Sequence, residues 1–302
     1  CTSMERLLIT LILVCTMSNI TNAQNPFYGQ YHTPHGTVPF DRMETEHYEP
    51  AILEGIKLQN AEIEAIIQNP EKADFSNTIE AFEASGELLD KVVAVFGNML
   101  SAETNDDLQE LAQKIMPLLS EHSNNITLNE KLFARVKEVY NQKETLQLTQ
   151  EQKQLLENAY NSFVRHGANL EGEAREEYRR LTNELSKLTL TFSENNLKET
   201  NAYQMLLTKK ESLAGLPEII IEAAAETAKS EEKEGWAFTL HAPSYVPFMT
   251  YSDNRDLRQK LYMAYNTKCT HDNEFNNIDI VKNIANTRMK IAQLLGYKDY
   301  AE

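Results

Sequence analysis

The sequence has few cysteines, glycines and prolines. Its 302 residues include only 3 cysteines, 10 glycines and 9 prolines. So little glycine and proline excludes a collagen-like chain and disfavours the turn-dense all-β folds. Cys1 and Cys15 lie in a segment that we expect to be removed, so the mature chain keeps only Cys269 and cannot form an internal disulfide. Cys269 has no CxxC partner, and we expect a buried or partly exposed thiol there.

Basic residues are also scarce relative to acidic ones. The sequence has 29 Lys and Arg against 45 Asp and Glu, which gives a formal net charge of −16. Proteins bind nucleic acids and anionic membrane surfaces through a basic face, because binding releases counterions. The composition therefore predicts no nucleic-acid partner, and no membrane partner once the amino-terminal segment has been cleaved. Hydrophobic residues make up 41% of the sequence, which is enough for a substantial core.

The amino-terminal segment has the features of a secretory signal. An apolar run at residues 7–14 is too short to cross a bilayer, and it follows Arg6 and precedes the small residue Ala23. We expect residues 1–23 to comprise a few upstream residues and a signal peptide at about residues 4–23. Cleavage after Ala23 would release the protein into the periplasm or the extracellular medium.

A lipid anchor at Cys15 is the alternative to soluble export. Lipidated cysteines usually follow a small residue, whereas Val14 precedes this one. Soluble export is therefore the expectation, and a diacylated Cys15 would contradict it.

The mature chain is predicted to be mainly α-helical. Residues 24–50 contain four prolines and are expected to form an extended arm. Beyond them, apolar residues recur every three or four positions, which is the spacing of amphipathic helices. We expect a helical domain over residues 51–210, and a mixed segment of helices and short strands over residues 211–302. Alternating apolar residues predict a short β element near residues 236–251.

Local signals predict several helix ends. Residues 77–80 have the form of a capping box and are expected to open a helix, as are residues 149–152. The spacing of leucines and aromatic residues predicts a long helix over about residues 173–199. A last helix is expected over about residues 278–295, ended by Gly296 in the left-handed conformation.

The sequence contains no recognisable catalytic motif. It has no His-Glu-x-x-His, no glycine-rich phosphate loop and no Gly-x-Ser-x-Gly elbow. His32 and His35 have the spacing of metal ligands, but Pro34 places them in a loop without a nearby third ligand. The imidazole of His271 and the carboxylate of Glu274 are close in sequence, but the residues between them indicate a polar turn. We therefore assign no catalytic, cofactor-binding or metal-ligating residue.

Short motifs spread along residues 25–302 do suggest a family. They read Asn-Pro-Phe at 25–27, Val-Pro-Phe-Asp-Arg at 38–42, Phe-Ser-Asn-Thr-Ile-Glu at 75–80, Pro-Ser-Tyr-Val-Pro at 243–247 and Leu-Leu-Gly-Tyr at 294–297. In this order they resemble motifs of the thimet oligopeptidase and neurolysin family of zinc peptidases. Val-Phe-Gly-Asn at 95–98 and Phe-Val-Arg-His-Gly-Ala at 163–168 are most similar to the bacterial peptidyl-dipeptidase (dipeptidyl carboxypeptidase) branch.

The resemblance implies zinc-dependent peptide hydrolysis in a longer protein. In this family the zinc helix with His-Glu-x-x-His and the later glutamate ligand follow the region that the present sequence resembles. The resemblance thus covers only the amino-terminal part, a neurolysin-like helical wall of the channel over the active site. It implies one zinc ion per catalytic site in the full-length protein, with a metal-bound water and the motif glutamate as general base. It also implies a monomer that acts on short peptides and releases carboxy-terminal dipeptides.

Two kinds of function remain open for the chain itself. As a fragment or a truncated product of such a peptidase, it is expected to bind no zinc and to be inactive alone. The alternative is a self-standing helical peptide-binding protein that has lost catalysis. A reading frame for His-Glu-x-x-His after the codon of Glu302 would favour the first.

Overall fold

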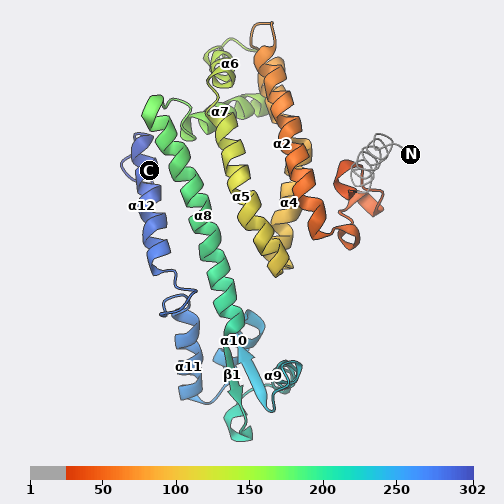
Figure 1. Cartoon of the computed structure of the whole chain (residues 1–302), viewed down its shortest axis with the longest axis vertical. Helices are drawn as coiled ribbons and strands as arrows, with labels where there is room; N and C mark the ends of the chain where they lie inside the picture. The colour runs from red at the N-terminus through yellow and green to blue at the C-terminus, as the bar shows by residue number, and fades with distance from the viewer. Residues whose placement is uncertain (1–24) are drawn as a thin grey trace, which may run out of the picture. The chain divides into compact units, whose positions relative to one another are not determined.

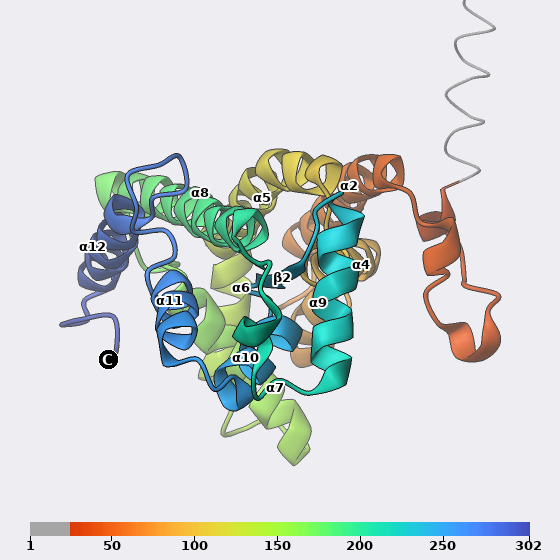
Figure 2. The ribbon, with the colours of Figure 1, turned by 90° about the horizontal axis from the view of Figure 1, so that it is seen from below.

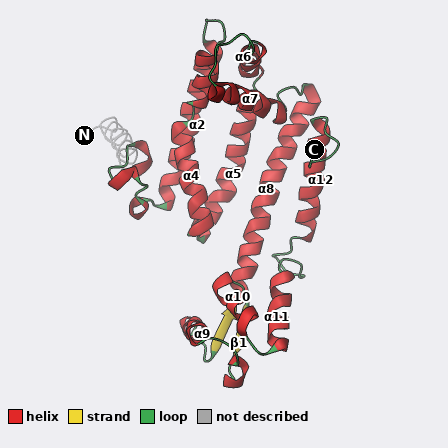
Figure 3. Cartoon of the chain, turned by 180° about the vertical axis from the view of Figure 1, so that it is seen from behind, coloured by secondary structure: helices red, strands yellow, loops and turns green. Residues whose placement is uncertain are grey.

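The computed structural model describes residues 25–302, so the signal peptide expected over residues 4–23 lies outside the described residues. The predicted mainly α-helical fold is confirmed, because the described residues form helices and only one two-stranded sheet (Figure 3). The chain divides into two compact units. Of the described residues, unit 1 contains 25–183 and 294–297, and unit 2 contains 184–293 and 298–302.

Unit 1 consists of α-helices, short 3₁₀ segments and the π-helix η4 (Figure 1). Its elements are η1 (Pro26–Tyr28), η2 (Pro34–Gly36), η3 (Phe40–Arg42), α2 (Thr45–Gln68), η4 (Phe75–Glu80), α3 (Ala81–Glu83), α4 (Glu87–Ala102), α5 (Asp106–Thr127), α6 (Glu130–Asn141), α7 (Gln150–Arg165) and the first part of α8 (Gly172–Ala202).

The expectation of an extended arm over residues 24–50 is wrong for residues 45–50, which belong to α2. The helix α2 begins before Pro50 rather than after it. The backbone N–H of Glu44 donates to Nδ1 of His47 at 3.0 Å, which caps the first turn upstream of the proline. Pro50 lies near the start of the helix, and the burial of Tyr48 against the rings of two neighbouring aromatic residues stabilises this turn.

The helix expected to open at residues 77–80 opens earlier. Asp74 is the cap, because its Oδ1 accepts from the backbone N–H of Asn77 at 2.7 Å. In return, Oδ1 of Asn77 accepts from the backbone N–H of Asp74 at 3.0 Å. Asn77 is therefore the third helical residue and not the cap. The helix also breaks at Gly86, where φ is +85°, and α4 starts after it.

The second predicted capping box is confirmed at the start of α7. The hydroxyl of Thr149 accepts from the backbone N–H of Gln152, and Oε1 of Gln152 accepts from the backbone N–H of Thr149. The helix that follows contributes Leu156 and Phe163 to the core of unit 1. The largest apolar side chains of that core are Ile63, Ile66, Phe75, Ile79, Ile126, Leu132, Phe133, Leu156 and Phe163.

Unit 2 combines helices with a small antiparallel sheet. Its elements are the second part of α8, β1 (Gln204–Leu207), η5 (Lys210–Leu213), α9 (Glu218–Ser230), β2 (Trp236–Thr239), α10 (Ala242–Tyr251), α11 (Arg255–Asn266) and most of α12 (Ile278–Leu294). In the sheet, Gln204 lies opposite Thr239 and Leu207 lies opposite Trp236. The helix α9 packs beside β2 (Figure 2).

The β element expected near residues 236–251 is shorter than predicted. The strand covers only β2, and residues 242–251 form the helix α10. Pro243 lies in the first turn of α10, where a proline costs no intrahelical hydrogen bond. The helices predicted over residues 173–199 and 278–295 are confirmed as α8 and α12. Gly296 has the predicted left-handed conformation, with φ of +87°.

No helix within residues 25–302 is both long enough and apolar enough to cross a bilayer.

Candidate functional site

The described part of the chain does not gather metal ligands. Among residues 25–302, no group of three or more His, Cys, Asp or Glu side chains could hold a metal ion. His32 and His35 lie in the exposed arm. Nε2 of His271 lies 3.7 Å from Oε1 of Glu199, so the carboxylate beside it belongs to α8 and is not that of Glu274. These residues do not fit the zinc that the resemblance implies.

Cys269 lies in a constrained position after α11. Its thiol is buried and unpaired, and its φ of +58° is rare for a residue with a side chain. The backbone N–H of Cys269 donates to Oε2 of Glu199, while Nζ of Lys268 donates to the hydroxyl of Thr200 at 3.0 Å. Burial, with the nearby Glu199 carboxylate adding to it, raises the pKa of the Cys269 thiol to about 11. The thiol is therefore protonated at neutral pH and is a poor nucleophile.

His122 is a buried histidine that the sequence analysis did not single out. Its Nε2 lies 2.6 Å from Oε1 of Gln59, which connects α5 to α2. Burial lowers the pKa of His122 below its usual 6.5, so the neutral imidazole is favoured. The helical spacing of His122, seven residues after the buried Ile115, is the sequence signal that could have predicted this burial. Because its hydrogen bond goes to the side-chain amide of Gln59 on a neighbouring helix, His122 has a structural role in unit 1.

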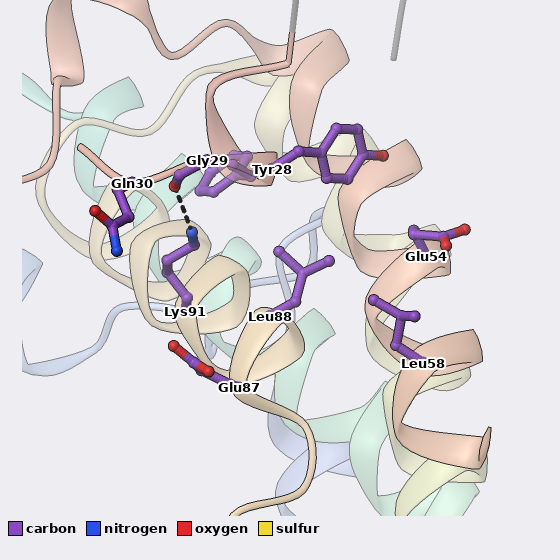
Figure 4. A pocket seen from close by; sticks show the side chains of 9 residues that line it. Tyr28, Gly29, Gln30, Glu54, Leu58, Glu87, Leu88 and Lys91 are labelled. Atoms are coloured by element: carbon purple, nitrogen blue, oxygen red, sulfur yellow. Dashed lines mark hydrogen bonds between the residues drawn. The ribbon is translucent and has the colours of Figure 1, made fainter. Parts of the chain in front are cut away.

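A pocket of about 530 Å³ lies between the arm and the helices α2 and α4 (Figure 4). Lys91 from α4 points to the arm, and its Nζ donates to the carbonyl oxygen of Gly29 at 3.2 Å. Glu54 lines the α2 side, where Lys57 pairs with it at 2.9 Å. The pocket has room for a small ligand, and its described lining carries the charged side chains of Glu54, Glu87 and Lys91.

Comparison with known proteins relates the chain to peptidases. Residues 248–302 match the model of peptidase family M3. The chain is 35% identical to a dipeptidyl carboxypeptidase of Escherichia coli strain K12 over 278 residues, which is 92% of this chain. It is 34% identical to a dipeptidyl carboxypeptidase and 29% identical to an oligopeptidase A, both of Salmonella typhimurium strain LT2, again over 92% of its length.

These matches cover only part of the relatives. The chain spans about 41% of the length of each of these three proteins. A partial span agrees with the expectation that the resemblance covers their amino-terminal part. The relationship that the short motifs predicted is thus confirmed, and the chain is a relative of the peptidases of family M3.

Proposed function

We propose that this chain is the amino-terminal helical part of an exported zinc metallopeptidase that hydrolyses short peptides and releases carboxy-terminal dipeptides. The observation that supports the proposal is the 35% identity to a dipeptidyl carboxypeptidase over 92% of the chain. The residues of unit 1 and unit 2 would then not perform the hydrolysis, because the described residues offer no group of metal ligands. The zinc ion of the full-length protein would be held by residues outside this sequence.

The contribution of the chain under this proposal is to select peptides. Helices that border a channel can exclude folded proteins and admit short, flexible chains. The formal charge of −16 gives the chain a negative field that repels acidic peptides, with a strength that falls as salt is added. Short peptides are thus the proposed substrates, and the full-length protein is proposed to act as a monomer after its signal peptide has been removed.

A second candidate function is peptide binding without catalysis. It is favoured by the combination of a pocket at the arm with the lack of a metal-ligand group among residues 25–302. The two functions differ in one respect that can be measured. A peptidase part acquires activity only with the remaining residues, whereas a binding protein retains peptides by itself.

The test starts with the coding sequence after the codon of Glu302 and with the purified chain. The proposal expects an open frame that encodes His-Glu-x-x-His, and expects the purified chain to retain no zinc after dialysis and to leave a fluorogenic short peptide intact. The E. coli dipeptidyl carboxypeptidase, assayed in parallel, is the positive control. Stoichiometric zinc together with peptide turnover by this chain would overturn the proposal. A stop codon combined with micromolar peptide binding would favour the second candidate.

Export is tested separately. The mature protein is expected to begin at Gln24 and to occur in the periplasmic or extracellular fraction. Mass spectrometry of the exported chain gives its first residue. A lipid on Cys15, or retention of the intact segment, would contradict soluble export.

A further inference from the structure

Unit 2 contains a small apolar pocket between α8 and the start of α12. It has a volume of about 370 Å³, within the range of pockets that hold small organic ligands. Its apolar walls come from Phe192 on α8 and from Ile278 and Val281 on α12. These three residues are 37%, 43% and 49% exposed, so their apolar surface is open to a ligand.

The charged residues of this pocket are lysines. Lys268 and Lys282 line it, and no Asp or Glu is among its described lining residues, although the whole sequence carries a formal charge of −16. Nζ of Lys268 lies 4.5 Å from the ring centroid of Tyr265. Nζ of Lys282 lies 3.0 Å from Oδ1 of Asp279, but both side chains are largely exposed, and such surface pairs contribute little. Lys282 can therefore exchange Asp279 for the anionic group of a ligand.

The walls of the pocket are held in place by a buried asparagine. Nδ2 of Asn277 donates to the carbonyl oxygen of Phe192 at 3.0 Å, and its Oδ1 accepts from Nδ2 of Asn195 at 2.9 Å. The backbone N–H of Asn277 also donates to the carbonyl oxygen of Cys269 at 2.7 Å. The backbone hydrogen bond joins the two ends of the segment from Cys269 to Asn277, and the side-chain bonds of Asn277 attach this segment to α8. A pocket that is already formed loses little conformational freedom when a ligand binds.

We propose that this pocket binds a small monocarboxylate that carries one apolar group. The apolar group would contact Phe192, Ile278 and Val281, and the carboxylate would accept charge-assisted hydrogen bonds from Lys282 and Lys268. Two sources share this chemistry, namely the carboxyl-terminal residue of a peptide and a short fatty acid. The proposal concerns unit 2 alone and does not rest on the proposed function.

Isothermal titration of the whole chain tests the chemistry of the ligand. The probes are N-acetyl-L-phenylalanine as a model of a peptide end, octanoate as a model of a fatty acid, and N-acetyl-L-phenylalanine amide as a neutral control. At least one carboxylate is expected to bind with Kd of about 0.1–1 mM, the range of a small ligand with one charged group. The amide is expected to bind at least about fivefold more weakly, since it lacks the ionised acceptor. Raising the salt concentration to 1 M is expected to remove most of this difference.

Substitutions on α12 test the position of the site. Val281→Glu is expected to abolish binding, and Lys282→Gln is expected to weaken it about threefold or more. Met289→Glu and Lys290→Gln are matched controls, because these residues are also exposed on α12 but do not line the pocket. Both controls are expected to keep the Kd of the unmodified chain. Circular dichroism of all four variants verifies that they are folded.

The outcomes separate the two ligand sources and can reject the site. Binding of N-acetyl-L-phenylalanine alone assigns the pocket to peptide ends, binding of octanoate alone assigns it to fatty acids, and binding of both supports the shared chemistry. The proposal is overturned if no carboxylate binds at 5 mM, if the amide binds as tightly as the acid, or if Met289→Glu weakens binding as much as Val281→Glu does.

Discussion

At the scale of single residues, burial decides how Cys269 and His122 behave. Burial disfavours the charged form of an ionisable group, so it raises the pKa of a thiol and lowers the pKa of an imidazole. Both shifts occur here, and both groups are neutral at neutral pH. The Cys269 thiol is therefore a poor nucleophile, and the His122 imidazole is a weaker base than an exposed histidine.

The first prediction concerns the reactivity of Cys269. The rise of the Cys269 pKa from 9.0 to about 11 lowers the thiolate fraction near pH 7.5 about a hundredfold. Only the thiolate reacts with alkylating reagents. Iodoacetamide should therefore modify Cys269 at least about a hundredfold more slowly in the folded chain than in urea. Peptide mapping by mass spectrometry separates this site from Cys1 and Cys15. Equal rates in the folded and unfolded chain would contradict the assignment.

The second prediction is a pH dependence that arises from His122. Its pKa is lowered in the folded state, so the unfolded state binds the proton more readily. The free energy of unfolding should be insensitive to this group above about pH 7.5 and should fall as the pH drops through 6.5. When the pH is lowered from 7.5 to 5.5, the free energy of unfolding should fall by up to about 1 kcal/mol less in His122→Gln than in the unmodified chain. Urea unfolding at the two pH values measures this difference.

The control for this prediction is His32→Gln, which changes an exposed histidine of the arm. This variant should keep the pH dependence of the unmodified chain. If His32→Gln and His122→Gln alter the pH dependence equally, burial of His122 is not its cause.

At the scale of elements, the contact between α2 and α4 depends on a glycine. A Cβ added at Gly55 would lie 2.9 Å from Cα of Leu89 and 3.0 Å from its backbone nitrogen, so the two helices would have to move apart. Gly97, on α4, has no neighbouring atom within 4 Å of such a Cβ. A side chain at position 55 would collide with the facing helix, whereas one at position 97 has free space, so the two glycines form a matched pair for substitution.

The third prediction uses this pair. Gly55→Ala should lower the free energy of unfolding by about 1–2 kcal/mol, because overpacking outweighs the gain in helix propensity. Gly97→Ala should raise it by about 0.5–1 kcal/mol, because the alanine fits and favours the helix. Urea unfolding followed by circular dichroism measures both changes. A stabilising Gly55→Ala would show that α2 and α4 are not in close contact there.

The sequence predicted those elements whose signals are local. Periodicity predicted α8 and α12, and the hydrogen-bonding capacity of Thr149 and Gln152 predicted the start of α7. Pro50 was misleading because a reciprocal cap formed upstream of it. The strand β1 was missed because its four residues alternate only weakly, and its pairing with β2 depends on residues about 30 positions away.

The candidate sites were less predictable than the helices. The pocket in unit 2 joins Phe192 to Val281, and the pocket at the arm joins Gly29 to Lys91. No spacing rule connects residues so far apart in sequence, because only tertiary packing brings them together. His271 illustrates the same limit, since the carboxylate beside its imidazole is that of Glu199 on α8 rather than that of the neighbouring Glu274.

At the scale of the whole molecule, each unit has a hydrophobic core of its own. A core cluster of unit 1 includes Phe163 and lies within residues 63–168. The core of unit 2 includes Phe248 and draws only on residues from 203 onward. Trp236 packs against the second core and is the one tryptophan of the sequence, so its fluorescence reports on unit 2.

The last prediction is that the two cores can be destabilised separately. Phe248→Ala should remove about 3–5 kcal/mol from the stability of unit 2 and lower the thermal midpoint that Trp236 fluorescence reports. Phe163→Ala is the matched substitution in unit 1, and it should lower the midpoint followed by far-ultraviolet circular dichroism while leaving the fluorescence midpoint unchanged, because no residue of the second core loses a contact. If both variants shift both midpoints equally, α8 couples the two cores into one cooperative transition, and the division into two units then describes geometry and not folding.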